Sequence, residues 1–393
     1  MRIIVLDSDY PAYLRLQYDN ARDLANRSYA VQMAHRRQSP SGIAYSYVRS
    51  FEKFGHQAQE IYVNNSWAQA AWAREQGIGG LSTPTTEPKP DGRLLVSLKR
   101  ALLPYRDTLY PAAKRLGLVP NLKRELSAVL EAQIEHYNPD VILNQHIAVV
   151  EPSLLRSFKR PGRLIVAQCG VAPPPDLDVR AYDFAISLIP WVVDDFRSKG
   201  LRAEQSHLAF DPRVLDLLGP APEKTIDVSF VGGLSSDHEG RIALLEGIAR
   251  EFPIELWLSN FKGIRAGSPL HKCYRGEAWD RNMYDVLRRS RITINTHINA
   301  ARGMAGNVRL YEATGVGTFL LTENHSNLPT LFEPGVEIGA YDSISDCLRQ
   351  IEYYLAHSPE RDEVARCGQT KTLAAHTYDK RVEELLRIWS GLL

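Results

Sequence analysis

The sequence predicts an α/β protein of two domains, each built on a doubly wound sheet, and three observations support this. First, 393 residues are more than a single hydrophobic core usually holds. Second, short buried strands alternate with amphipathic helices from residues 2–6 onward, and the same alternation restarts at residues 227–231. Third, residues 208–224 are typical of a loop and end in a Pro-rich hinge, where one domain gives way to the next.

The first half opens with a strand, a helix and a second strand. After the strand at residues 2–6, residues 41–54 place apolar side chains at helical spacing, and a strand follows at residues 60–63. The same criteria predict helices at residues 121–136 and 191–199, and strands at residues 141–144, 163–167 and 184–189. Because the carboxyl ends of parallel strands meet at one edge of a sheet, polar residues at these ends are candidate site residues.

Two strand ends in this half carry titratable side chains. Asp7 and Asp9 follow the first strand, and His146 follows the strand at residues 141–144. Asp7 and His146 are the candidate catalytic residues, and His146 suits a general base because imidazole titrates near neutral pH. The alternatives are that the aspartates form a turn or a helix cap, and that His146 is a capping or core histidine.

The second half is organised around residues 291–323. An alternating strand leads into a loop that contains Gly306, a short helix starts near Asn307 and closes at Gly315, and a buried strand follows. Glycine lets an anion approach the free N–H groups at the positive end of such a helix. The sequence therefore predicts a phosphate site at Gly306 and Asn307.

Two charged residues of this short helix extend the predicted site. Arg309 in the first turn offers a bidentate grip on phosphate oxygens, and Glu312 offers a carboxylate to the two hydroxyls of a ribose. Together they describe a pocket for a nucleoside diphosphate. Spacing alone leaves the alternative that the two residues form a surface ion pair in a plain αβ unit.

Two further residues, Asn295 and His297, are expected to line this pocket. They end the strand that leads into the glycine loop, and Asn299 is expected on the same face. Short polar groups beside a glycine loop are seldom buried for packing alone, which favours a pocket lining.

Several sequence blocks of the second half occur in the order found in a known family. They are NVRLYEATGVG at residues 307–317, FLLTE at 319–323, LFEPG at 331–335 and HTY at 376–378. They resemble the donor-site region of the group 1 glycosyltransferases, above all the CgeB-like branch, and the resemblance covers residues 227–386.

The resemblance implies the GT-B fold, in which two Rossmann-like domains face each other across a cleft. It also implies that Gly233, in the glycine turn after the strand at residues 227–231, and Arg275 lie at the donor site, with an exposed loop arginine as the alternative for Arg275. Residues 1–215 would form the acceptor domain, residues 225–376 the nucleotide-sugar donor domain, and residues 377–393 a helix crossing back to the first domain. One position departs from the family pattern, because Met304 stands where many retaining relatives carry an acidic residue facing the transferred sugar. The identity of the transferred sugar and the stereochemical outcome are therefore not inferred from the family.

The implied activity is transfer of a sugar from a nucleoside-diphosphate sugar to an unidentified acceptor, which is a glycan, a lipid-linked molecule, a protein or a small molecule. The nucleotide sugar is a substrate, and no metal or cofactor is expected. Two alternatives are kept: a sugar-nucleotide epimerase of the same fold, and a protein that binds a nucleotide sugar or a partner without turnover.

Composition bounds the partners and the compartment. A net charge of +1 gives no reason to expect nucleic acid, and the four cysteines show no CxxC spacing, so structural zinc and a disulfide framework are not expected. A strand at the start and the lack of a long apolar run predict a cytoplasmic protein. The resemblance implies a role in bacterial-type glycan biosynthesis. The basic stretch at residues 93–124 predicts either a solvated helix face or a peripheral contact at the inner face of the membrane.

Overall fold

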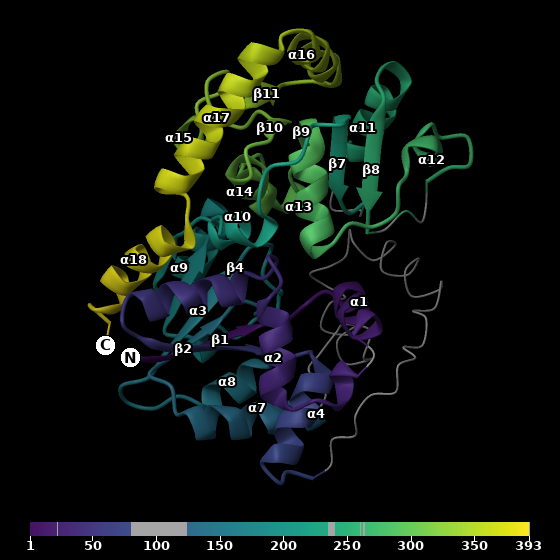
Figure 1. The fold of residues 1–393 in the computed structure, drawn as a ribbon. Helices are drawn as coiled ribbons and strands as arrows, with labels where there is room; N and C mark the ends of the chain where they lie inside the picture. Colours follow the sequence, from purple (N-terminus) through teal and green to yellow (C-terminus); the bar gives the residue numbers. More distant parts are fainter. Residues whose placement is uncertain (22, 80–123, 235–239, 260, 262–263, 393) are drawn as a thin grey trace. The chain divides into compact units, whose positions relative to one another are not determined.

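The computed structural model describes the chain except for residues 22, 80–123, 235–239, 260, 262–263 and 393 (Figure 1). The predicted loop at residues 81–91 lies outside the described residues, and so does the predicted basic stretch apart from its last residue. Contacts divide the chain into two compact units, one formed by Met1–Ser206 with Val382–Leu393 and the other by His207–Arg381. The domain limits proposed from the sequence stay predictions.

The first unit is built on a parallel sheet of six strands in the order β2-β1-β3-β4-β5-β6. Its strands are β1 (Arg2–Asp7), β2 (Gln57–Tyr62), β3 (Val141–Asn144), β4 (Leu164–Cys169), β5 (Phe184–Ser187) and β6 (Ala203–Gln205). Its α-helices include α1 (Pro11–Asn20), α2 (Tyr29–Arg37), α3 (Ile43–Lys53), α4 (Ser66–Glu75), α7 (Arg124–Tyr137), α8 (Pro152–Ser157) and α9 (Pro190–Ser198). The sheet order reverses between β1 and β3, which is the arrangement that gathers loops at the carboxyl ends of these strands.

The last helix of the chain, α18 (Tyr378–Trp389), ends in the core of the first unit. Trp389 is fully buried and stacks on Phe51 of α3 with ring centroids 5.5 Å apart. Helix α3 packs on β1 and β2, so the end of α18 joins the helical layer over those two strands. Aromatic side chains of this size contribute much of the apolar area that a core buries.

The second unit is built on a parallel sheet of five strands in the order β11-β10-β9-β7-β8 (Figure 1). The strands are β7 (Ile226–Gly232), β8 (Ile254–Leu258), β9 (Ser290–Asn295), β10 (Phe319–Glu323) and β11 (Gly339–Tyr341). Its helices include α10 (Arg213–Leu218), α11 (Arg241–Glu251), α12 (Leu270–Cys273), α13 (Asp280–Arg289), α14 (Val308–Gly315), α15 (Leu328–Leu331), α16 (Ile344–Ala356) and α17 (Ser358–Ala375). The α/β class with two parallel sheets, predicted from the sequence, is confirmed.

Both faces of this sheet are covered, and the strand residues alternate between two cores. Phe319 and Leu321 of β10 join a core with α11 and α16, whereas Leu320 between them joins a core with α13 and α14. Near-continuous apolar runs are expected of parallel strands buried on both faces. The helix layers thereby hold the carboxyl ends of β7, β9 and β10 at one edge.

Several helices of the second unit were not expected from the sequence, α10 and α17 among them. The predicted loop at residues 208–224 contains the short helix α10, and α17 lies between α16 and α18. The buried face of α17 carries small residues, among them Ala365, Gly368 and Thr372. Such a face gives no apolar periodicity, so the sequence could not reveal it.

We expect Gly368→Ala to destabilise the second unit by about 3 kcal/mol, because a methyl group there has no room. A Cβ atom built on Gly368 would lie 2.2 Å from the backbone oxygen of Glu337. The measurement is the urea midpoint, with Gly267→Ala as the control, since nothing lies within 4 Å of a Cβ at Gly267. Equal midpoints for the two variants would contradict the close packing of α17.

Candidate functional site

The predicted strand, glycine loop, helix and strand form one structural unit, composed of β9, α14 and β10. Asn307 is the N-cap of α14, and its Oδ1 accepts a hydrogen bond from Leu310 N–H. Its side chain also exchanges two hydrogen bonds with the amide of Asn295, at 3.1 and 2.9 Å. Asn307 Nδ2 further donates to the backbone oxygen of Thr296 at 2.9 Å. The two predicted site residues Asn295 and Asn307 therefore pin the helix N-terminus to the end of β9.

The glycine loop that precedes α14 is held by a residue that the sequence did not single out. Asn327 accepts from Ala305 N–H and donates to Ala305 O, both at 2.8 Å. Gly303 has a φ of 78°, a backbone conformation that glycine adopts without steric cost. Gly306 is buried directly before the N-cap, where an anion would meet the first-turn N–H groups.

Arg309 and Glu312 form an ion pair at 2.8 Å, and their side chains are only 14% and 13% exposed. The tyrosine hydroxyl of Tyr284 donates to Glu312 Oε1 at 3.4 Å. Burial and the neighbouring Glu312 carboxylate raise the pKa of Tyr284, so its hydroxyl stays protonated. The ion pair that the sequence left as an alternative is present, but it is largely buried and does not lie on the surface.

His297, Glu323 and His325 form a second polar group at the ends of β9 and β10. The backbone N–H of His297 donates to Glu323 Oε2 at 2.7 Å, and the two imidazole rings lie 4.9 Å apart. Burial, assisted by His325, lowers the pKa of His297 to about 4. Burial opposes ionisation of Glu323, but its contacts with His325 and with His297 N–H lower its pKa overall. At neutral pH the group therefore consists of a neutral His297 and an ionised Glu323.

Asn299 does not share the face of Asn295 and His297, so that expectation was wrong. Strand β9 ends at Asn295, and Asn299 lies exposed in a 3₁₀ turn over Asn299–Ala301. The alternation of a strand cannot be extended past the residue at which the strand ends. Asn295 and His297 do share a contact, since both lie within hydrogen-bond distance of Thr322 Oγ1.

Arg241 is a buried cation that the sequence analysis missed. Its guanidinium donates to Thr296 Oγ1, to Thr296 O and to the backbone oxygen of Gly233. Among the residues described, no carboxylate lies within ion-pair distance of Arg241. Burial lowers the pKa of Arg241 to about 10, although the negative charge of Glu323 acts to raise it. No sequence signal pointed to Arg241, because its partner Thr296 lies 55 residues further along the chain.

Arg275 is not brought to this group. It lies beside β8, at the outer edge of the sheet, and β7 separates β8 from β9. Its guanidinium donates to Lys272 O at 2.9 Å and lies 3.6 Å from the carboxylate of Glu255. Arg275 is therefore an exposed loop arginine, which was the alternative given for it. Gly233 does belong to the polar group, because its backbone oxygen accepts a hydrogen bond from Arg241.

In the first unit, Asp7 and His146 lie at the ends of the neighbouring strands β1 and β3. Ser8 links the two strand ends, because its hydroxyl is hydrogen-bonded to Nδ1 of His146. Burial and the charge of Asp9 raise the pKa of Asp7 to about 7. The backbone N–H of Ser8 donates a hydrogen bond to the Asp7 carboxylate and partly opposes this rise. Burial lowers the pKa of His146. A carboxyl group that titrates near neutral pH is suited to general base catalysis.

Asp9 differs from Asp7 because it has an arginine partner. Arg36 makes a bidentate contact with the Asp9 carboxylate, at 2.9 and 2.7 Å, and both side chains are buried. The guanidinium also lies over the rings of Tyr13 and Tyr62. Asp9 thus belongs to a buried structural ion pair, whereas the described residues include no ion-pair partner for Asp7.

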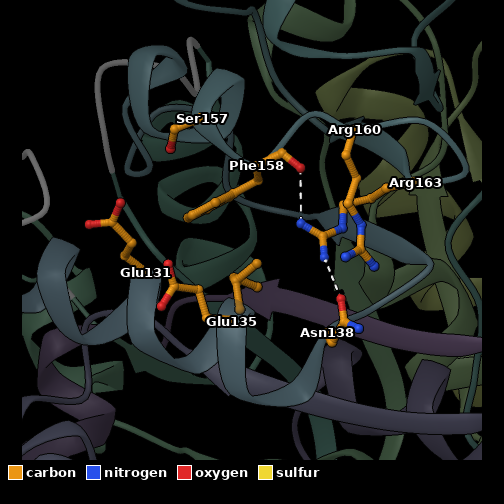
Figure 2. A pocket seen from close by; sticks show the side chains of 8 residues that line it. Glu131, Glu135, Asn138, Ser157, Phe158, Arg160 and Arg163 are labelled. Carbon is orange, nitrogen blue, oxygen red and sulfur yellow. Dashed lines mark hydrogen bonds between the residues drawn. The ribbon is translucent and has the colours of Figure 1, made fainter.

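A hollow of about 250 Å³ lies elsewhere in the first unit, where α7 meets the segment between α8 and β4 (Figure 2). Arg163 closes one side of it by donating to Phe158 O at 2.9 Å and to Asn138 Oδ1 at 3.2 Å. Asn138 precedes β3 and Arg163 precedes β4, so the hollow lies at the amino ends of these strands. It does not include Asp7 or His146.

Metal-ligand clusters and membrane-spanning helices are both absent from the described residues. These residues contain no group of three or more His, Cys, Asp or Glu side chains placed to hold a metal ion. No helix within the described part of the chain combines the length and the apolar character that crossing a membrane requires.

Comparison with known proteins was made for sequence and for fold. Residues 241–387 match the model of a family described as glycosyl transferase-like. The matched residues include all of β9, α14 and β10. No curated protein matches the sequence significantly.

Solved structures resemble the whole chain at low identity. A glycosyltransferase from Rickettsia africae is 10% identical, with a TM-score of 0.57 over 99% of this chain and 98% of that chain. The Anabaena protein HepE, in complex with UDP-glucose, is 13% identical, with a TM-score of 0.55 over the full length of both chains. Sucrose-phosphate synthase from Thermosynechococcus elongatus is 10% identical, with a TM-score of 0.55 over 100% of this chain and 99% of that chain.

These likenesses confirm the predicted GT-B fold of two Rossmann-like halves. The sequence similarity to the glycosyl transferase-like family covers residues 241–387, which is less than half of the chain.

Proposed function

We propose that the enzyme transfers a sugar from a nucleoside-diphosphate sugar to an acceptor hydroxyl. The observation that carries the proposal is the unit β9, α14 and β10, which lies within the family match and presents an N-capped helix terminus behind a glycine loop. HepE, which shares the fold, was crystallised with UDP-glucose, and this supports a nucleotide sugar as the donor.

The donor diphosphate would bind at the N-terminus of α14. First-turn N–H groups there have no intrahelical partners and lie at the positive end of the helix dipole. Arg309 in the first turn adds a cation, and the buried Arg241 adds positive potential from the end of β7. Fixed positive groups of this kind stabilise the charge that develops on a departing diphosphate. Glu312, held by Arg309 and Tyr284, would accept hydrogen bonds from the ribose.

The acceptor would be activated by the first unit. Asp7, with a pKa of about 7, would take the proton of the attacking hydroxyl, with His146 on the adjacent strand end beside it. His146 is held through Nδ1 by Ser8, which fixes the orientation of the imidazole. A base whose pKa lies near the working pH combines the correct protonation state with sufficient driving force.

The finer parts of the proposal have separate grounds. The resemblance of residues 227–386 supports the CgeB-like branch, with a glycan or lipid-linked acceptor. Arg309 and the N-terminus of α14 would neutralise the departing diphosphate without a metal ion. Composition supports a cytoplasmic location, and the basic stretch at residues 93–124 supports a peripheral one at the inner face of the membrane. The acceptor and the base of the nucleotide are left open.

A thermal-shift panel tests the donor. One nucleoside diphosphate among UDP, GDP, ADP and CDP is expected to raise Tm, because a ligand at 100 times its Kd stabilises the folded state by about 2.7 kcal/mol. The same shift is expected in EDTA. A shift that EDTA abolishes would contradict transfer without a metal, and no shift with any nucleotide would contradict the donor site.

Product analysis separates the alternatives. Incubation with the selected nucleotide sugar, followed by NMR, distinguishes a transferred or hydrolysed sugar from an epimerised one. Binding without any turnover, with every acceptor offered, would favour the non-catalytic alternative.

A further inference from the structure

Glu323 and His325 follow strand β10 and are the more exposed members of the polar group at this edge of the second unit. Their side chains are 32% and 20% exposed. Asn295, His297 and Thr322, which support them, are buried. A ligand bound at this edge therefore contacts Glu323 more readily than it contacts the residues beneath.

The Glu323 carboxylate is oriented by its neighbours. Its Oε2 accepts from His297 N–H at 2.7 Å and lies 3.7 Å from Nε2 of His325, which is outside hydrogen-bond distance but within ion-pair distance of a protonated ring. Glu312 has Arg309 as an ion-pair partner at 2.8 Å. Among the residues described, Glu323 has no lysine or arginine in the same role.

The charge of Glu323 decides which part of a nucleotide sugar it can bind. Its pKa is lowered, and the neighbouring His297 is neutral at physiological pH. An ionised carboxylate only accepts hydrogen bonds, so it binds hydroxyl groups. Its negative charge repels a diphosphate. Glu312 is suited to the ribose hydroxyls, and this leaves the sugar hydroxyls for Glu323.

The loop that carries Glu323 lies against the loop that carries Met304. Asn327, four residues after Glu323, makes both of its 2.8 Å hydrogen bonds to the backbone of Ala305, the neighbour of Met304. The resemblance described under the sequence analysis implies an acidic residue at the position of Met304 in many retaining relatives. Glu323 supplies a carboxylate from the loop bound to that position.

We propose that Glu323 binds a hydroxyl group of the transferred sugar, with the His325 ring beside it. The imidazole Nε2 of His325 has no hydrogen-bond partner in the described part of the chain and faces the same carboxylate oxygen. A sugar hydroxyl between the two groups would donate to Glu323 and accept from His325. The inference rests on the proposed function and adds the side chain that recognises the sugar.

The test compares two ligands on one variant. Isothermal titration measures Kd for the nucleoside diphosphate chosen by the thermal-shift panel and for its hexose conjugates. Glu323→Gln keeps the acceptor for His297 N–H but loses the charge, so we expect about tenfold weaker binding of the preferred sugar conjugate, since charged hydrogen bonds are the stronger ones. Binding of the nucleoside diphosphate should change less than twofold. Glu352→Gln, on the exposed face of α16, is the matched control and should change neither Kd.

Each outcome bears on the proposal. An equal loss for both ligands would place Glu323 at the diphosphate or in the fold, and it would overturn the inference. Unchanged binding of both ligands would overturn it as well. In either case the nucleotide still binds to the wild type and the proposed function stands. If the wild-type protein binds neither ligand, the proposed function fails and this inference fails with it.

Discussion

Replacing Asp7 with asparagine is expected to lower kcat for sugar transfer by a factor of about 10² to 10⁴, the usual contribution of a general base. The carboxyl group lies at the end of β1, and burial together with Asp9 places its pKa at about 7. Asparagine has nearly the same shape but cannot take a proton. The affinity for the nucleotide sugar, measured by titration, should stay at the wild-type value because the donor residues lie in the second unit.

The pH dependence gives an independent check on Asp7. Transfer by the wild type should rise as pH increases through about 7, where Asp7 loses its proton, and level off above that pH. The pKa of Asp7 is 3.8 in the unfolded chain and about 7 in the folded protein, so the unfolded chain releases this proton at the lower pH. The contribution of Asp7 to stability is therefore present below pH 4 and is lost as pH rises to 7.

Asp7→Asn should then be at least as stable as the wild type at pH 8, although it is inactive. A variant that keeps more than half of the wild-type rate would remove Asp7 from the mechanism. His146→Ala serves as the comparison on the adjacent strand end, and we expect it to lower transfer less than Asp7→Asn does, with donor affinity unchanged. The reverse order would give the role of general base to His146.

Arg309→Ala is expected to weaken binding of the nucleoside diphosphate by about 2 kcal/mol, which is about thirtyfold in Kd. The variant loses a cation at the N-terminus of α14. It also leaves Glu312 without its ion-pair partner while that carboxylate is 13% exposed. A largely buried, unpaired carboxylate next to a diphosphate adds repulsion to the lost attraction.

Arg291→Ala is the matched control for Arg309→Ala. Arg291 lies at the amino end of β9 and pairs with Asp227 at the start of β7, far along the strand from the glycine loop. Its removal should leave the nucleotide Kd unchanged in the same titration. Equal Kd values for the wild type and Arg309→Ala would show that the helix terminus binds the diphosphate without this side chain.

The elements predicted best from the sequence are those whose signal is local. Strand β3 (Val141–Asn144) has the limits that the sequence predicted, because its short apolar run is typical of a buried parallel strand. Helix α17 has no such signal. Gly368 and Thr372 are buried because Glu337 and Thr314 pack against them, and these contacts are set by the tertiary fold.

The same distinction applies to the candidate site. Asn307 could be predicted as the start of α14, because an asparagine before a helix is a common N-cap. Its partner Asn295 and the clamp between Asn327 and Ala305 depend on which strands are neighbours, which the sequence alone does not give. Arg241 also became visible only when the order of β7 and β9 was known.

The first unit contains residues from both ends of the chain, and this orders its assembly during synthesis. Residues 207–381 are contiguous, so the ribosome completes the second unit before it makes Trp389. Until then the core around Phe51 lacks the indole that stacks on it, and its apolar surface is open to water or to chaperones. Domains usually fold in the order in which they are made. The second unit can therefore finish folding while the first still waits for residues 382–393 to be translated.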